Sequence, residues 1–345
     1  MSSTTSTKDT YQSFKQQWRS IVAKYQEPSV ARSAWQIINS FVPYFVCWAL
    51  MYLSLSVSYW LTLALALPTA GFLVRIFIIQ HDCGHGSFFK NAKTNDIWGA
   101  ISALLCATPY YYWKHDHALH HASNGNLDRR GHGDIWTMTV EEYLTSPWYK
   151  KLGYRIYRNP AVMFGVGSFF LFIIEYRIPP RKGTTRDRIS VLRTDLALLG
   201  VVAFMHFTIG IPAFVMIQAP IFFFAAAAGT WLFYVQHQFE GVYWARDEEW
   251  DFVDGSMKGS SYYRLPKVLQ WFTGNIGFHH IHHLSSKIPN YFLERCHKEN
   301  EALQQVHQLT IWSSLKCLRF RVLNEQTGEL LTFSQLRALR KSAQA

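Results

Sequence analysis

Histidines occur in clusters along this chain, and the spacing within each cluster is typical of metal ligands. The clusters are HDCGH at 81–85, HALHH at 117–121 and HHIHH at 279–283, and a single His237 lies between the last two. On a helix, positions i, i+3 and i+4 share one face, so HALHH and HHIHH can each direct three imidazoles to one point. The candidate metal ligands are His81, His85, His117, His120, His121, His237, His279, His282 and His283.

These nine imidazoles are more than one metal ion needs. A structural zinc ion takes four ligands, whereas nine nitrogens suit two metal ions with roughly four or five ligands each and room for oxygen. Imidazole also binds copper, nickel and zinc, so the ligand type alone does not select iron. One HxxHH motif is compatible with an ordinary surface helix, but two such motifs, an HxxxH motif and a further histidine together favour a metal site.

Four carboxylates lie close to the histidines and could orient them. A metal-bound imidazole usually donates its second ring nitrogen to a carboxylate or a carbonyl group. The candidates for this role are Asp82, Asp116, Asp134 and Glu240. An ordinary surface charge is the alternative for each of them. The aromatic run Tyr110–Trp113 is interpreted as part of a membrane-interface belt, with the lining of a substrate channel as the alternative.

Two long apolar segments are expected to cross a membrane as two helical hairpins. The first extends from Phe41 to Ile79 and carries one charge, Arg75, and the second extends from Leu196 to Val235. A helix needs about 20 apolar residues to cross a bilayer, so each segment has room for two spans. The expected turns lie near Ser56–Tyr59 and Gln218–Pro220, and the expected spans are about 41–58, 60–79, 195–216 and 220–236.

The basic residues indicate which side of the membrane the connecting segments occupy. Of 34 lysines and arginines, 5 precede residue 33, 15 lie between 80 and 193, and 13 follow residue 245. Because cytoplasmic loops carry an excess of Lys and Arg, both termini and the middle segment are expected on the cytoplasmic side. The net charge of +11 is thereby explained by topology and by attraction to anionic lipid headgroups. Nucleic-acid binding is not expected.

The remaining segments complete the expected fold. Residues 1–38 are expected to form a cytoplasmic or interfacial segment, and 39–345 a membrane domain with a cytoplasmic, histidine-rich cap at 80–194 and 237–345. The shorter apolar runs Ile97–Trp113 and Ala161–Ile174 are interpreted as interfacial or re-entrant, the alternative being a second spanning hairpin. The stretch 318–333 predicts a small β-hairpin. The expected class is an all-α integral membrane protein with about four transmembrane helices, interfacial helices and this C-terminal hairpin.

Composition agrees with a membrane protein. Apolar residues make up 49% of the chain and charged residues 17%, as expected for membrane spans joined by polar segments. The five cysteines form no CxxC pair, which indicates reduced thiols and no disulfide framework. No cleaved signal peptide is expected, because no apolar stretch precedes the first span.

At the histidine clusters the sequence resembles the membrane fatty acid desaturases, and the resemblance extends from about Phe41 to Tyr291. HDCGH, WKHDHALHH and GFHHIHHLSSKIPNY look like the three histidine boxes of that family, in the form found in bacterial and cyanobacterial acyl-lipid desaturases of the delta-5 and delta-12 types. The resemblance implies a di-iron centre bound by the eight box histidines, and His237 matches an additional histidine between boxes two and three. It assigns no ligand role to His115 or His280.

The resemblance also implies an activity. Such an enzyme uses O2 and two iron ions to remove two hydrogens from an acyl chain of a membrane lipid, which leaves a cis double bond. Two electrons must come from outside, and since no cytochrome b5 module, flavin module or GxGxxG motif is apparent, ferredoxin or another separate donor is expected. The expected location is the plasma membrane or another cell membrane, with the active site on the cytoplasmic side.

Two alternatives remain open at this point. A di-iron hydroxylase of lipids or hydrocarbons would use the same histidines, although the HxxxH first box and the HHLSSKIPNY tail favour a desaturase. A metal transporter or sensor would instead require ionisable residues at mid-membrane depth, and the expected spans contain almost none.

Overall fold

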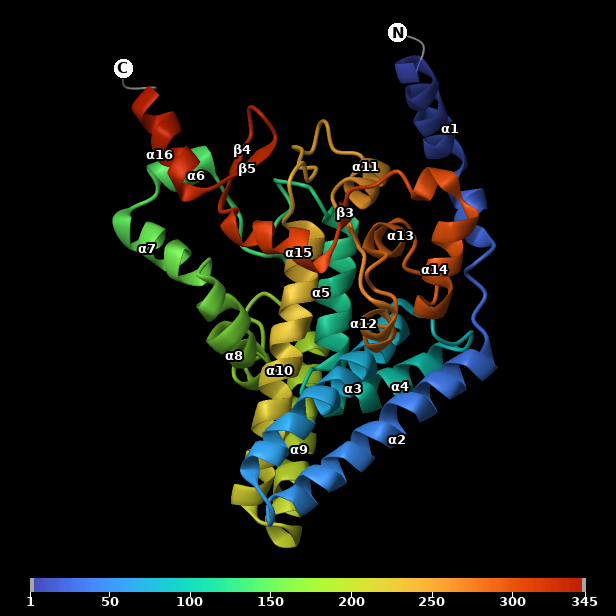
Figure 1. Ribbon diagram of the computed structural model, residues 1–345, viewed down its shortest axis with the longest axis vertical. Helices are drawn as coiled ribbons and strands as arrows, with labels where there is room; N and C mark the ends of the chain where they lie inside the picture. Colours follow the sequence, from blue (N-terminus) through green and yellow to red (C-terminus); the bar gives the residue numbers. More distant parts are fainter. Residues whose placement is uncertain (1–2, 343–345) are drawn as a thin grey trace.

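Four long helices form the lower part of the molecule; α4 (Ala92–Leu105) and α8 (Ser168–Ile173) lie beside them, and most of the remaining segments form a cap above them (Figure 1). The computed structural model describes residues 3–342. Four helices in this part of the chain are long and apolar enough to cross a bilayer: α2 (Val30–Ser54), α3 (Tyr59–His85), α9 (Thr185–Thr208) and α10 (Ile211–His237). The prediction of four spans in two hairpins is confirmed. Both hairpin turns lie at the bottom of Figure 1, and both chain ends lie at the cap.

The spanning helices are longer than the apolar segments within them. The helix α2 begins at Val30, after Ser29, whose side chain accepts a hydrogen bond from the Arg32 amide. The helix α9 begins at Thr185, where Thr184 and Asp187 form a capping box. Hydropathy marks only the part of a helix that lies in hydrocarbon, whereas helical hydrogen bonding continues through polar residues outside it. Segments expected in the cap and in the N-terminal segment are therefore helical extensions of the spans.

The turn of the first hairpin lies where it was predicted, and the turn of the second does not. The structure places the second turn at Ile209–Gly210 and not at Gln218–Pro220. Gly210 has a φ of 82°, a conformation that favours glycine. Pro212 lies in the first turn of α10, where the backbone amide has no hydrogen-bond partner within the helix, so the lack of an amide hydrogen in proline removes no helical hydrogen bond.

Gln218 and Pro220 lie inside α10 because neighbouring helices supply the hydrogen bonds that they require. The buried Gln218 accepts a hydrogen bond from Nε1 of Trp48 on α2 at 3.1 Å. Pro220 has no amide hydrogen for the carbonyl of Met216, and Tyr59 Oη donates to that carbonyl at 3.3 Å. Gln218 and Pro220, which suggested a turn, thus lie where the two hairpins contact each other.

The two shorter apolar runs do not form additional straight spans. The run Ile97–Trp113 is divided between α4 (Ala92–Leu105) and α5 (Tyr110–Ser123), each of 14 residues. The run Ala161–Ile174 belongs to a bent unit made of α7 (Trp148–Tyr157), a π-helix (Val162–Gly167), α8 (Ser168–Ile173) and a 3₁₀ turn (Glu175–Arg177). Only the two arms of this unit together have the length and hydropathy of a span, and they meet at 74°. This is the geometry of a broken or re-entrant segment.

The cap contains short helices and strands. Its helices are α1 (Ser3–Ala23), α6 (Val140–Thr145), α11 (Phe252–Met257), α12 (Lys267–Phe272), α13 (His279–Leu284), α14 (Asn290–Glu299), α15 (Ile311–Ser314) and α16 (Phe333–Ser342), with 3₁₀ turns at Glu301–Leu303 and Leu315–Arg319. Its strands are β1 (Met138–Thr139), β2 (Tyr262–Tyr263), β3 (Gln308–Leu309), β4 (Val322–Asn324) and β5 (Glu329–Leu331). The pair β4–β5 is antiparallel, which confirms the predicted hairpin, and β1 joins β4 in parallel; β2 and β3 pair separately.

The N-terminal helix α1 is fastened to the part of the cap that carries the third histidine cluster. Phe14 and Val22 are buried in one apolar cluster with Ile281 of α13. Lys15 Nζ lies 2.7 Å from a carboxylate oxygen of Asp254 and 2.9 Å from one of Asp251. Apolar burial and these ion pairs hold α1 beside α13.

We expect Gln218→Leu to lower the free energy of unfolding by about 1 kcal/mol, because Trp48 Nε1 loses its acceptor in a segment without water. Reversible unfolding in mixed micelles with increasing SDS measures this change. The matched control is Trp48→Phe, alone and combined with Gln218→Leu. Strictly additive losses in the double variant would contradict the contact.

Candidate metal centre

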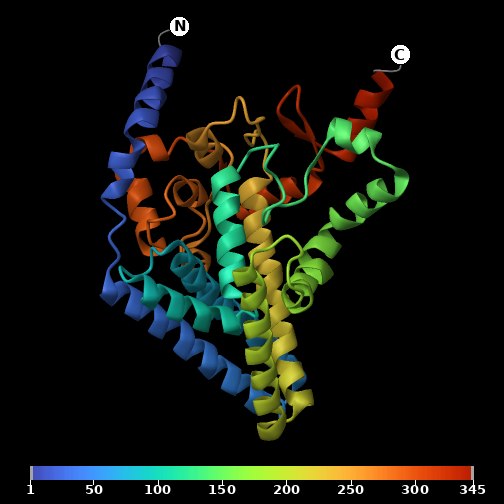
Figure 2. The same ribbon diagram turned by 180° about the vertical axis from the view of Figure 1, so that it is seen from behind.

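The clustered histidines converge at the cap end of the helical bundle. His81 and His85 lie at the end of α3, and His237 is the last residue of α10. The HALHH motif lies on α5 and the HHIHH motif forms most of α13. The helices α5 and α10 lie side by side in both views (Figure 1 and Figure 2). Four segments that are distant in the sequence thereby contribute histidines to one cluster.

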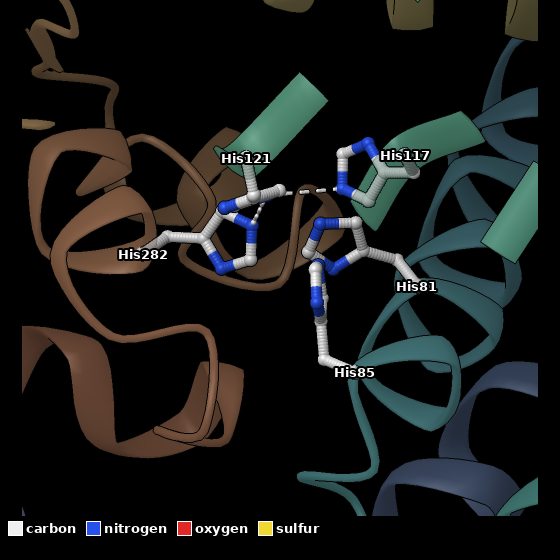
Figure 3. A group of neighbouring side chains, drawn as sticks. All are labelled: His81, His85, His117, His121 and His282. Atoms are coloured by element: carbon white, nitrogen blue, oxygen red, sulfur yellow. Dashed lines mark hydrogen bonds between the residues drawn. The ribbon is translucent and has the colours of Figure 1, made fainter. Parts of the chain in front are cut away.

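The first group of histidines contains five residues. They are His81, His85, His117, His121 and His282, whose ligand nitrogens all lie within 4.8 Å of one another. Figure 3 shows these imidazoles pointing toward one another from α3, α5 and α13. The Nε2 atom of His121 lies 3.2 Å from Nε2 of His117 and 2.9 Å from Nε2 of His282.

The second group adjoins the first. The ligand nitrogens of His120, His237 and His283 lie within 4.8 Å of one another. His279 joins them, since its Nε2 atom lies 2.9 Å from Nε2 of His237 and 3.1 Å from Nε2 of His283. The rings of His121 and His283 stack with centroids 4.1 Å apart, which connects the two groups. The structure therefore divides the nine predicted ligands into groups of five and four.

This donor set fits two metal ions better than it fits a hydrogen-bond network. A ring nitrogen carries either one proton or one lone pair and so makes one good bond, yet Nε2 of His121 and Nε2 of His279 each have two close nitrogen neighbours. The Nε2 atoms of His81, His85 and His120 are buried without any hydrogen-bond partner. A cation at the centre of each group would accept all of these lone pairs.

The imidazoles are also held in the form that binds metals. Five of them have pKa values well below the usual histidine value: His117, His121, His279, His282 and His283. Burial is the main cause, and the neighbouring imidazoles lower these pKa values further. A metal ligand has to be a neutral imidazole, because the protonated ring has no free lone pair.

Two of the four predicted carboxylates contact metal-ligand candidates. Asp82 Oδ1 lies 3.1 Å from His81 Nδ1, while its Oδ2 accepts from the backbone and side-chain nitrogens of Asn290 at 2.7 and 2.8 Å. Asp134 Oδ1 lies 2.6 Å from His120 Nδ1, and its other oxygen accepts from the Gly131 amide at 3.1 Å. Each carboxylate holds Nδ1 on one side of a ring and leaves Nε2 directed to the centre.

The other two carboxylates do not make such contacts. Asp116 Oδ1 lies 3.5 Å from Nδ1 of His132, which is outside both groups. Glu240 is exposed, and among the described residues it has no hydrogen bond to any of the nine histidines. Proximity in the sequence therefore did not distinguish the carboxylates that contact these histidines from those that do not.

Three contacts were missed by the sequence analysis. His237 Nδ1 lies 3.2 Å from the Gly259 carbonyl oxygen, and since every residue has a carbonyl group no sequence signal marked it. A Cβ at Gly259 would lie 2.3 Å from the Gly255 oxygen, so only glycine fits there. Asn290 donates hydrogen bonds to Asp82, and its place in the HHLSSKIPNY tail that carries the family resemblance could have indicated it. Trp113 is buried and stacks on the metal-ligand candidate His117 with ring centroids 4.6 Å apart, so it packs against the histidines and is not part of an interfacial belt.

The two extra histidines in the boxes lie outside both groups. His115 Nδ1 lies 3.0 Å from Asp187, the capping residue of α9. His280 is buried and its Nε2 pairs with the Leu303 carbonyl oxygen at 2.9 Å; burial lowers its pKa to about 3. Both therefore have structural roles in neighbouring segments.

Comparison with known proteins gives a consistent result. A profile of the fatty acid desaturase family matches residues 57–315. A fatty acid desaturase of Bacillus subtilis is 46% identical over 316 residues, which cover 92% of this chain and 90% of that protein. An sn-1 acyl-lipid omega-3 desaturase (ferredoxin) of Synechocystis is 29% identical, over 64% of this chain and 62% of its own length. An sn-1 oleoyl-lipid 12-desaturase of Synechocystis is 26% identical over 66% of each chain.

We expect Asp82→Asn and Asp134→Asn each to weaken iron binding by roughly 10- to 100-fold, because each removes the charge that orients a ligand histidine. Iron retention against a chelator, measured on protein in detergent, tests this expectation. The matched control is Asp116→Asn, which changes the charge equally and touches neither group. Equal iron loss in all three variants would contradict the assigned roles.

Proposed function

The chain belongs to the fatty acid desaturase family, and we propose that it inserts a cis double bond into the acyl chain of a membrane lipid at two iron ions held by nine histidines. The observation that carries this proposal is the convergence of five and four imidazoles from α3, α5, α10 and α13. Membership of the family sets aside a metal transporter. The names of the cyanobacterial relatives, an acyl-lipid desaturase (ferredoxin) and an oleoyl-lipid desaturase, support a lipid-bound substrate and a separate electron donor.

The reaction needs a stronger oxidant than any side chain provides. Iron, when bound, supplies this oxidising chemistry with O2, while the protein supplies binding and orientation. In this chain the nine histidines would hold the metal ions through their ring nitrogens. Asp82, Asp134 and the Gly259 carbonyl group fix three of the rings by accepting from Nδ1–H.

Part of the histidine centre is shielded from water. His279, His282 and His283 are each 3% exposed or less, and Trp113 covers one side of His117. The loss of water from these parts of the site strengthens the electrostatic contacts inside it. We assign to Trp113 the positioning of the His117 ring.

The orientation in the membrane follows from the charges. Both hairpin turns, at 55–58 and 209–210, are without lysine or arginine, whereas the cap is rich in both. The excess of positive charge favours a cytoplasmic cap. The metal centre and both chain ends then face the cytoplasm, where electron donors are available.

Expression in a bacterial host without its own desaturase tests the proposal. We expect cis-monounsaturated acyl chains in the extracted lipids by gas chromatography and mass spectrometry, and only in aerated cultures. His121→Ala should reduce the product at least 100-fold, because His121 bridges the two groups. Hydroxylated chains in place of unsaturated ones would identify a hydroxylase and contradict the proposal.

The matched control for that experiment is His115→Ala, six positions earlier on the same helix. His115 contacts Asp187 and no metal-ligand candidate, so we expect at least half of the activity to remain. A comparable loss in both variants at equal protein levels would contradict the division between ligand and structural histidines.

A further inference from the structure

A cavity of about 560 Å³ opens in the cap directly beside the two histidine groups. Its inner wall includes His121 of the first group and His283 of the second, whose rings stack on each other. Its other walls come from α1, α5, α11 and the segment after α13. In Figure 1 these elements lie at the end of the molecule opposite the loop between α9 and α10. The cavity therefore approaches the centre from the aqueous side.

The mouth of this cavity is positively charged. Arg19 is exposed, and its guanidinium lies 5.3 Å from the centre of the Trp18 ring. Lys287 is also exposed, and its Nζ donates to the His85 carbonyl oxygen at 2.7 Å. None of the described residues that line the cavity is acidic. The nearby Asp251 and Asp254 of the α11 segment are paired with Lys15 and do not cancel this charge.

The proposed reaction requires electrons at the two histidine groups. Reduction of one O2 to two water molecules takes four electrons and four protons. The two C–H bonds that are lost provide two electrons and two protons, so a donor must deliver two electrons and the solvent two protons. Electrons that enter through His121 or His283 reach ligands of both metal groups directly, because these rings belong to different groups and are in contact.

We propose that a small acidic one-electron carrier protein docks over this mouth, with its carboxylates on Arg19 and Lys287 and an apolar surface on Trp18. This proposal rests on the proposed function and adds the docking surface. Charge complementarity is the reason for choosing this occupant, since opposite potentials steer association and arginine and tryptophan are frequent interface anchors.

Binding measurements test the proposal independently of activity. The iron-loaded protein is placed in nanodiscs of uncharged phosphatidylcholine, and binding of purified acidic ferredoxin and flavodoxin is measured by biolayer interferometry at low and high salt. We expect Arg19→Glu to weaken binding of at least one carrier about tenfold and Arg19→Glu/Lys287→Glu about 100-fold, with a smaller salt dependence. The matched control is Arg181→Glu/Lys182→Glu, an equal charge change at exposed residues that do not line the cavity.

A single turnover after chemical reduction separates the two proposals. The iron-loaded protein is reduced anaerobically with dithionite, the excess dithionite is removed, and O2 is then added. Arg19 lies on α1, which carries none of the candidate metal ligands, so Arg19→Glu should keep the wild-type single-turnover yield, iron content and thermal stability while its KM for the carrier rises. Absence of any unsaturated product from the reduced wild type after O2 is added would overturn the proposed function, whatever the binding results. Unchanged carrier binding in the Arg19 variants, equal weakening in the control, or a raised KM for the lipid in place of the carrier would overturn the docking surface alone.

Discussion

The structure depends on bringing nine imidazoles together with their nitrogens facing one another. Nitrogens this close together require surrounding groups that fix each ring, and a cation at the centre of each group would remove the repulsion between their lone pairs. The carboxylates of Asp82 and Asp134 and the Gly259 carbonyl group contact the outer nitrogens of three rings. Burial disfavours the charged form of five others, His117, His121, His279, His282 and His283.

This requirement explains the shape of the fold. Two histidine groups can form only if α3 and α10, the second helices of their respective hairpins, end at the same level and bring their last turns together. Contacts between the hairpins at Trp48–Gln218 and Tyr59–Met216 hold that alignment from within the apolar region. The short helices α5 and α13 then need to add their histidines from the cap, which explains why these segments do not cross the membrane as long helices.

Sequence patterns predicted the number of spans, the C-terminal hairpin and the set of histidines that converge, because hydropathy and helical spacing are local properties. They placed the second turn wrongly, since Gln218 and Pro220 resemble turn residues unless one knows that Trp48 and Tyr59 face them. They also could not separate Asp82 and Asp134 from Asp116 and Glu240. That distinction depends on which way a side chain points after four distant segments have come together.

The six-residue helix α13 gives His282 to the first group and His279 and His283 to the second. One short helix therefore belongs to both groups, and the positions of the two groups depend on each other through its backbone. A displacement or rotation of this single turn and a half of helix would move imidazoles of both groups at the same time. The spacing between the two groups is consequently set within α13 and not only by the packing of the long helices.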